Sequence, residues 1–168
     1  MARGSENIDI KKSQIHSKGV FAKRNIKKGE FIIEYVGEIV DKKESDRRLH
    51  ASLERHKKDS THAFTYIFEL NDTWDLDGDT TPNDAKYINH SCDPNCSFQI
   101  KDGHIEICAA REIPQGEELS YNYGFDVDED YEDYQCQCGA KNCVGYMVAE
   151  EDWPELRRLV EKTREKKG

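Results

Sequence analysis

The chain has 168 residues, a formal net charge of −9 and a mean hydropathy of −0.92. Charged residues make up 35% of it and aromatic residues 10%, which leaves enough apolar mass for the core of one domain of ordinary size. The negative charge argues against direct nucleic-acid binding, which depends on Lys and Arg side chains, and favours a basic protein partner. The sequence has no apolar leader and no apolar run of about 18 residues, so we expect no membrane span and a soluble, intracellular domain.

Residues 8 to 40 predict short β-strands joined by tight turns. The apolar run at 31 to 36 has the β-branched and aromatic composition of a strand. Gly19, Gly29 and Gly37 interrupt the apolar pattern and mark turns or places where another backbone approaches closely.

A helix is predicted from residue 41 to about residue 60. Asp41 occupies the N-cap position and Glu44 the capping-box position of this segment. Its apolar stripe is thin and consists of Leu49, Ala51 and Leu53. We therefore expect a surface helix inserted between strands and not a core helix.

Strand patterns return after this insert. Residues 64 to 70 alternate with period two, and residues 74 to 77 are expected to form the return strand. Residues 97 to 101 and 104 to 110 predict a hairpin, because the Asp102-Gly103 dipeptide between them is typical of tight hairpin turns. A final helix is predicted over residues 153 to 166, where Leu156, Leu159 and Val160 have helical spacing.

Residues 89 to 96, Asn-His-Ser-Cys-Asp-Pro-Asn-Cys, concentrate functional groups. They supply two amides, an imidazole, a hydroxyl, two thiols and a carboxylate. Asp, Pro and Asn are also ordinary turn residues, so the stretch is consistent with a turn before a strand. Whether it is also a site depends on the partners that other parts of the chain offer.

The six cysteines predict a metal site. The last three, Cys136, Cys138 and Cys143, form a C-x-C-x4-C cluster. Thiols this close suit one metal better than two disulfides, and structural zinc takes four ligands in a tetrahedron. Cys92 or Cys96 can supply the fourth ligand, whereas Cys108 lies inside an expected strand and is more simply a small buried residue. Either choice would hold the C-terminal segment against residues 89 to 96.

Two further patterns precede the cysteine cluster. Tyr121, Tyr123 and Phe125 alternate and would lie on one face of an extended segment, which core packing alone can explain. Residues 126 to 133 hold six carboxylates, a pattern typical of a solvated linker, although such a run could also attract a basic peptide.

These blocks, in this order, resemble the SET-domain protein lysine methyltransferases that carry a post-SET zinc motif. The blocks are Ser17-Lys18-Gly19-Val20-Phe21-Ala22, Glu34-Tyr35-Val36-Gly37-Glu38, residues 89 to 96, Gly116-Glu117-Glu118-Leu119 with Tyr121 and Tyr123, and the C-x-C-x4-C cluster. Together they cover about residues 8 to 147. Each block alone is a weak signal, but all of them in the family's order make a specific match.

The resemblance implies a mainly β (α+β) fold. It is a SET fold of small curved β-sheets in which residues 89 to 96 and 121 to 125 cross in a knot-like arrangement. With the helices predicted above, we expect a SET domain at residues 8 to 126 with a helical insert at about 41 to 60. A post-SET zinc motif at 132 to 148 and a C-terminal helix at 149 to 168 would follow.

The same resemblance implies the site residues. Tyr123 corresponds to the catalytic tyrosine, and Tyr35 and Tyr121 to residues that line the lysine channel. The residues expected to bind the cofactor, S-adenosylmethionine, are Lys18, Gly19, Tyr66, Lys86, Tyr87, Asn89, His90, Tyr123 and Tyr146. The expected zinc ligands are Cys92, Cys136, Cys138 and Cys143. Two positions depart from the family pattern: Ser17 replaces the first glycine of Gly-x-Gly, and Lys86-Tyr87 replaces an Arg-Phe pair.

The implied activity is S-adenosylmethionine-dependent methylation of a lysine side chain in a basic protein segment, with a histone tail as the leading substrate. Because the Tyr121 hydroxyl narrows the channel, we expect monomethylation or dimethylation. The alternative is a catalytically silent, zinc-stabilised SET-like interaction module, and a zinc-ribbon nucleic-acid binder is disfavoured by the charge. The expected location is the nucleus and chromatin in a eukaryote, and otherwise the cytoplasm.

Overall fold

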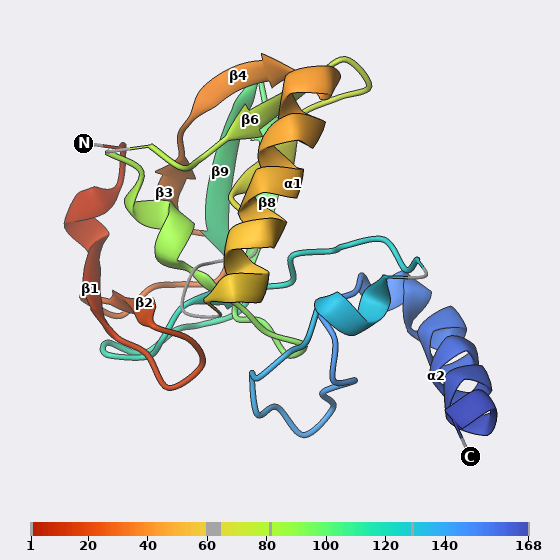
Figure 1. Cartoon of the computed structure of the whole chain (residues 1–168). Coiled ribbons are helices and arrows are strands. Elements are labelled where there is room, and N and C mark those ends of the chain that lie inside the picture. The colour runs from red at the N-terminus through yellow and green to blue at the C-terminus, as the bar shows by residue number, and fades with distance from the viewer. Residues whose placement is uncertain (1, 60–64, 81, 129, 168) are drawn as a thin grey trace.

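The computed structural model describes residues 2–59, 65–80, 82–128 and 130–167. Small β-sheets and two α-helices dominate it, which confirms the predicted mainly β architecture (Figure 1). The strands are β1 (Ile8–Lys12), β2 (Lys18–Ala22), β3 (Phe31–Tyr35), β4 (Glu38–Asp41), β5 (Ile67–Glu69), β6 (Trp74–Asp77), β7 (Asn89–His90), β8 (Cys96–Lys101), β9 (His104–Ala109) and β10 (Ser120–Tyr121). The helices are α1 (Lys42–Lys58) and α2 (Trp153–Lys167), with short 3-10 helices η1 (Ser5–Asn7), η2 (Asp84–Tyr87), η3 (Tyr131–Asp133) and η4 (Glu150–Asp152).

Among the described residues the strands form the sheets β1-β2, β3-β9-β8, β4-β6-β5 and β7-β10. The predicted hairpin is confirmed as β8 and β9. Its two turn residues, Asp102 and Gly103, have φ values of 51° and 80°, and this left-handed backbone is what a two-residue hairpin turn with right-handed strand twist requires.

The predicted insert helix is confirmed as α1, which lies against β4 and β6 (Figure 1). The Asp41 carboxylate accepts a hydrogen bond from the backbone N–H of Glu44 at 2.8 Å, as expected for an N-cap. The Glu44 carboxylate binds Arg48, and Arg48 also binds Asp77 on β6 at 2.7 Å. Ion pairs therefore fix this helix to the sheet, in agreement with its thin apolar stripe.

The strand predicted at residues 64 to 70 is shorter than expected. β5 spans only Ile67–Glu69, and residue 64 lies outside the described residues. The carbonyl of Tyr66 accepts a hydrogen bond from the backbone N–H of Gly78 at 2.9 Å, which continues the β5-β6 register by one residue beyond Ile67. It also accepts one from the Tyr35 hydroxyl at 2.8 Å, which ties this end of the strand to β3.

The described residues pack into two apolar cores. The larger lies among the sheets and includes Ile33, Ile107 and Leu119, each with 0% exposure. The smaller joins Tyr131 and Val148 to Leu156 of α2, which confirms the predicted C-terminal helix. Figure 1 shows α2 at the opposite end of the molecule from β4.

The acidic run at 126 to 133 is not wholly a solvated linker. Tyr131 within it is buried and its hydroxyl donates to Thr163 of α2 at 3.2 Å, so the run is anchored to the smaller core. Neither described α-helix has the length and apolar composition that crossing a bilayer requires.

Candidate active site and metal cluster

Residues 89 to 96 lie beside residues 120 to 121 and form the centre of the candidate site. β7 and β10 run parallel with the register Asn89↔Ser120 and His90↔Tyr121. The Asn95 amide joins the two segments: its Oδ1 accepts from the Ser120 N–H at 2.9 Å, and its Nδ2 donates to the Glu118 carbonyl at 2.8 Å. The stretch is therefore both a turn and the meeting point of two distant segments.

His90 connects this stretch to Tyr123. The backbone N–H of Tyr123 donates to His90 Nδ1 at 3.1 Å, so the proton of a neutral ring lies on Nε2. Burial lowers the pKa of His90 to about 4, which keeps the ring neutral near pH 7. The other ring nitrogen, Nε2, lies 3.6 Å from the Cys92 sulfur. One imidazole thus links the Tyr123 backbone to a predicted metal ligand.

The three tyrosines predicted to form the lysine channel lie in one aromatic cluster. The ring centroids of Tyr121 and Tyr123 are 5.0 Å apart. Phe68 joins them to Tyr35, with centroid distances of 5.7 Å to Tyr121 and 4.8 Å to Tyr35. The Tyr123 hydroxyl donates to the carbonyl of Ile88 at 2.9 Å, which fixes its ring.

Burial raises the pKa of each of these three tyrosine hydroxyls above its ordinary value, so all of them stay neutral near pH 7. An ionised carboxylate in this position would stabilise an ammonium group. A neutral aromatic cluster does the opposite and favours the uncharged form of an amine that enters it.

Two members of this cluster were missed by sequence reasoning. Phe68 was assigned only to a half-buried strand, yet its ring bridges the tyrosines. Gly78 was not singled out, yet a Cβ there would lie 2.3 Å from Cε1 and 2.4 Å from the hydroxyl oxygen of Tyr35. No local pattern marks either role, because both arise from contacts between distant strands.

The structure brings together several of the residues expected to bind the cofactor. The Asn89 amide donates to the Lys18 carbonyl at 3.0 Å and to the Glu118 carboxylate at 2.9 Å. A Cβ on Gly19 would lie 2.3 Å from that same carboxylate, so this position needs glycine. Glu118 belongs to a block that the sequence analysis singled out, but its role as the acceptor that holds Asn89 in place was missed. Ser17, the departure from Gly-x-Gly, keeps a left-handed backbone with φ of 42°.

A second group of expected cofactor residues surrounds the Tyr87 ring. The ammonium groups of Lys18 and Lys86 lie 5.1 Å and 5.5 Å from its centroid. Lys86 also lies 5.4 Å from the Tyr66 ring and 3.3 Å from an Asp79 carboxylate oxygen. The Lys86-Tyr87 pair, which departs from the family's Arg-Phe, therefore still places a cation at this end of the site.

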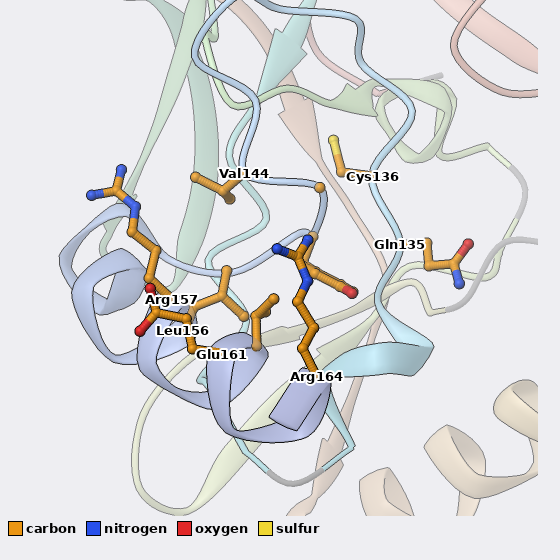
Figure 2. A pocket seen from close by; sticks show the side chains of 10 residues that line it. Gln135, Cys136, Val144, Leu156, Arg157, Glu161 and Arg164 are labelled. Atoms are coloured by element: carbon orange, nitrogen blue, oxygen red, sulfur yellow. The ribbon is translucent and has the colours of Figure 1, made fainter. Parts of the chain in front are cut away.

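Tyr146 lies apart from these residues. Its ring is 5.0 Å from that of Tyr131 in the smaller core. It also lines a pocket of about 490 Å³ between the cysteine loop and α2 (Figure 2). Figure 2 shows Val144 on the loop side of this pocket, and Leu156 and Arg164 on the α2 side. A role for Tyr146 in cofactor binding stays a prediction.

The four cysteines expected to bind zinc lie together. The sulfur atoms of Cys92, Cys136, Cys138 and Cys143 all lie within 4.8 Å of one another. The Cys92 sulfur is 3.9 Å from that of Cys136 and 3.8 Å from that of Cys143. A regular tetrahedron with Zn–S bonds of about 2.3 Å has S···S edges of about 3.8 Å, so the spacing fits zinc.

The thiols of this cluster differ in their surroundings. Burial raises the pKa of Cys92 to about 12. Burial acts in the same direction at Cys138, but hydrogen bonds from the backbone N–H groups of Cys92 and Ala140 outweigh it and lower the pKa to about 7. Cys96 points elsewhere: its sulfur lies 3.3 Å from the Asn95 side-chain oxygen and is buried.

Comparison with known proteins gives the family. The SET domain family matches residues 17–124. The chain is 39% identical over 147 residues to the variant-silencing SET domain-containing protein of Plasmodium falciparum (85% of this chain, 6% of that protein). It is 35% identical over 145 residues to human histone-lysine N-methyltransferase 2D (84% and 2%) and 38% over 156 residues to histone-lysine N-methyltransferase mes-4 of Caenorhabditis elegans (85% and 17%). It thus spans only a small part of the length of each relative. The chain belongs to the SET-domain family.

Proposed function

We propose that the chain transfers a methyl group from S-adenosylmethionine to a lysine side chain in a histone. The observation that carries this proposal is the position of Tyr123, which is held at both its hydroxyl and its backbone N–H within a neutral aromatic cluster. Two of the relatives above are named histone-lysine N-methyltransferases, which supports a histone as the substrate. The net charge of −9 suits a basic histone tail, and a histone substrate implies a location at chromatin.

The residues around Tyr87 and Asn89 are the proposed cofactor site. Lys18 and Lys86 place two ammonium groups near the Tyr87 ring, which suits the carboxylate of the cofactor's amino-acid part. When bound, S-adenosylmethionine supplies a methyl group on a cationic sulfonium. The amide of Asn89, held by Glu118, and the backbone around Lys18 and Gly19 would contact the rest of the molecule.

The tyrosines would prepare the lysine for attack. With a reference pKa of about 10.4, a lysine amine costs about 4 to 5 kcal/mol to deprotonate at pH 7. A buried aromatic channel lowers this cost because it cannot solvate an ammonium group. Tyr35 and Tyr121 would enclose the lysine methylenes, and Tyr123 would orient the neutral amine in line with the methyl group.

The four-cysteine cluster is the proposed structural zinc site. It would join the C-x-C-x4-C loop to Cys92 and so to residues 89 to 96. All four ligands come from the protein, which leaves no open position for chemistry at the metal.

Transfer of label from S-adenosylmethionine to mixed histones tests the proposal. The unmodified protein should label a histone, and Tyr123→Phe should lower the rate by about 10²-fold or more because the amine loses its orienting hydroxyl. Tyr134→Phe is the matched control, since its hydroxyl bonds to Asp128 outside the channel and its loss should leave the rate unchanged. Cofactor binding without any transfer would instead support the catalytically silent interaction module.

A further inference from the structure

Four large apolar side chains are unusually exposed on two sheets of the molecule. Ile39 of β4 is 59% exposed and Trp74 of β6 is 45% exposed. Phe98 and Ile100 of β8 are 41% and 43% exposed. Among the described residues, Ile10 of β1 is the one other large apolar side chain with comparable exposure, at 38%. Exposed apolar side chains that lie in a group often mark a binding surface, whereas single exposed apolar residues are ordinary.

Strand register within one sheet and one ring contact to the next sheet relate these side chains. Leu76 of β6 lies opposite both Ile39 of β4 and Phe68 of β5, so the three side chains share one face of the sheet. Trp74 is two residues from Leu76 and therefore lies on the same face. The Phe68 ring then meets the Phe98 ring at 4.9 Å. We define the apolar strip as Ile39, Phe68, Trp74, Phe98 and Ile100.

α1 does not cover this face. Its ion pairs reach Asp77 and Glu38, which lie opposite each other and point to the other side of the β4-β6-β5 sheet. On the face of Ile39 and Trp74, Leu76 is 6% exposed and belongs to the larger core, so the apolar strip follows the exposed margin of that core, and α1 lies on the opposite side of the sheet.

The apolar strip begins at the lysine channel. Phe68 stacks on Tyr121 at 5.7 Å, and the Phe98 ring lies 6.1 Å from that of Tyr121. An extended peptide advances about 3.3 Å per residue and places residues i and i+2 on the same side, about 7 Å apart. A lysine that enters the channel at Tyr121 would thus bring the side chain two residues away to Phe98.

We propose that the apolar strip binds the substrate segment beside the target lysine, and that the preferred substrate carries a large apolar side chain two residues from that lysine. This inference rests on the proposed function, because it takes the channel as the place where lysine enters. Phe98 and Ile100 project from the same side of β8 and would enclose that side chain together. Ile39 and Trp74 would contact more distant substrate residues.

Two lysine peptides that differ only at the positions two residues before and after the lysine test the inference. One carries Leu at both positions and the other Ser. The unmodified protein should show a KM about tenfold lower for the Leu peptide, the effect expected when one apolar side chain is buried on a partly exposed surface. Fluorescence anisotropy with norleucine in place of the lysine measures binding of the same pair without any reaction.

Ile100→Ser and Phe98→Ser should each reduce the ratio of the two KM values, and of the two binding constants, towards one. Ile100→Ser is the sharper variant, because Phe98 also contacts Tyr121 and its loss could disturb the channel. Ile10→Ser is the matched control: it removes a comparably exposed apolar side chain on β1 and should leave the ratio at about tenfold.

Equal KM values for the two peptides in the unmodified protein would overturn the inference while leaving the proposed function intact. A ratio that survives both Ile100→Ser and Phe98→Ser would also overturn it. If neither peptide is methylated, the anisotropy ratio alone decides the apolar strip, and the proposed function fails only if mixed histones also receive no label. If the protein sediments as a dimer that Ile100→Ser dissociates, and the peptides bind alike, the strip is a contact between copies and the inference is wrong.

Discussion

A Cβ atom on residue 78 would overlap the Tyr35 ring, so a glycine outside the sequence motifs decides where a tyrosine of the proposed channel lies. The clash would be with ring carbons and with the hydroxyl oxygen, at 2.3 to 2.5 Å. The Tyr35 hydroxyl is also tied to the Tyr66 carbonyl, so the ring cannot move without losing that hydrogen bond. Gly78 therefore leaves the space that the Tyr35 ring occupies and so positions that ring.

Gly78→Ala should lower kcat/KM about tenfold or more and destabilise the fold by about 1 to 3 kcal/mol, the usual cost of overpacking. Gly29→Ala is the control, because a Cβ there would meet nothing within 4 Å. Because Gly29 has a positive φ of 79°, Gly29→Ala should lower the stability of the fold, but the folded variant should retain its activity. Steady-state kinetics and thermal unfolding of both variants check this, and normal activity in Gly78→Ala would refute it.

Tyr121 is expected to limit how many methyl groups a lysine receives. Its ring lies between Phe68 and Tyr123, so removing the hydroxyl should enlarge the space around the amine. The unmodified protein should give monomethyl and dimethyl products, and Tyr121→Phe should shift the distribution towards trimethyllysine. Mass spectrometry of the product measures this, and trimethylation by the unmodified protein would contradict it.

Sequence motifs identified the residues with functional groups but not those that position them. Asn89, His90 and Tyr123 belong to recognisable blocks, and the structure brings them together. Phe68 and Gly78 carry no such signal, because a Phe in a strand and a Gly after a strand are common. Their roles depend on which strand lies opposite, and that is set by the whole fold.

α1 is held to its sheet by charge and not by an apolar face. Arg48 binds Glu38, Glu44 and Asp77, and its side chain is 27% exposed. Among the residues that the structure describes, Arg47 binds only Glu44, and its side chain is 68% exposed. The two neighbouring arginines thus allow a matched comparison on one helix.

Arg48→Met should destabilise the protein by about 1 to 3 kcal/mol, because it leaves the Asp77 carboxylate, only 13% exposed, without its cation. Arg47→Met should change stability by less than about 0.5 kcal/mol, as exposed ion pairs usually do. Denaturant unfolding of both variants measures the difference. Equal effects would mean that the ion pairs of Arg48 do not dock α1.

Among the secondary-structure elements, the features set by local chemistry were predicted correctly, whereas the features set by tertiary contacts were not. The Asp41 cap and the Asp102-Gly103 turn were predicted because their geometry is local, and both are confirmed. The strand at 64 to 70 was predicted too long: β5 begins at Ile67, and the Tyr66 carbonyl before it bonds both to Gly78 and to the Tyr35 hydroxyl of another sheet. Alternation of residue types cannot show such a contact.

For the whole molecule, the cysteine cluster joins segments more than 40 residues apart. Sequence spacing alone left Cys92 and Cys96 as equal candidates for the fourth ligand. The fold separates them, since Cys92 lies beside the C-x-C-x4-C loop and Cys96 starts β8 with its sulfur against Asn95. His90 then connects the cluster to Tyr123.

Cys92→Ser should therefore lower the zinc content from about one ion per chain and lower the melting temperature. Cys96→Ser should keep the zinc, although it alters a buried position. Metal analysis and thermal unfolding of the two variants check this. Zinc that stays after Cys92→Ser and is lost after Cys96→Ser would show that the ligand assignment is wrong.

The position of the transferred methyl group tests the central claim most directly. A basic peptide with one lysine, and the same peptide with arginine in its place, are incubated with the protein and methyl-labelled S-adenosylmethionine, and fragment masses locate the label. We predict methyl groups on the lysine side chain alone and none on the arginine peptide. Label on any other residue, or no label despite bound cofactor and peptide, would contradict the account.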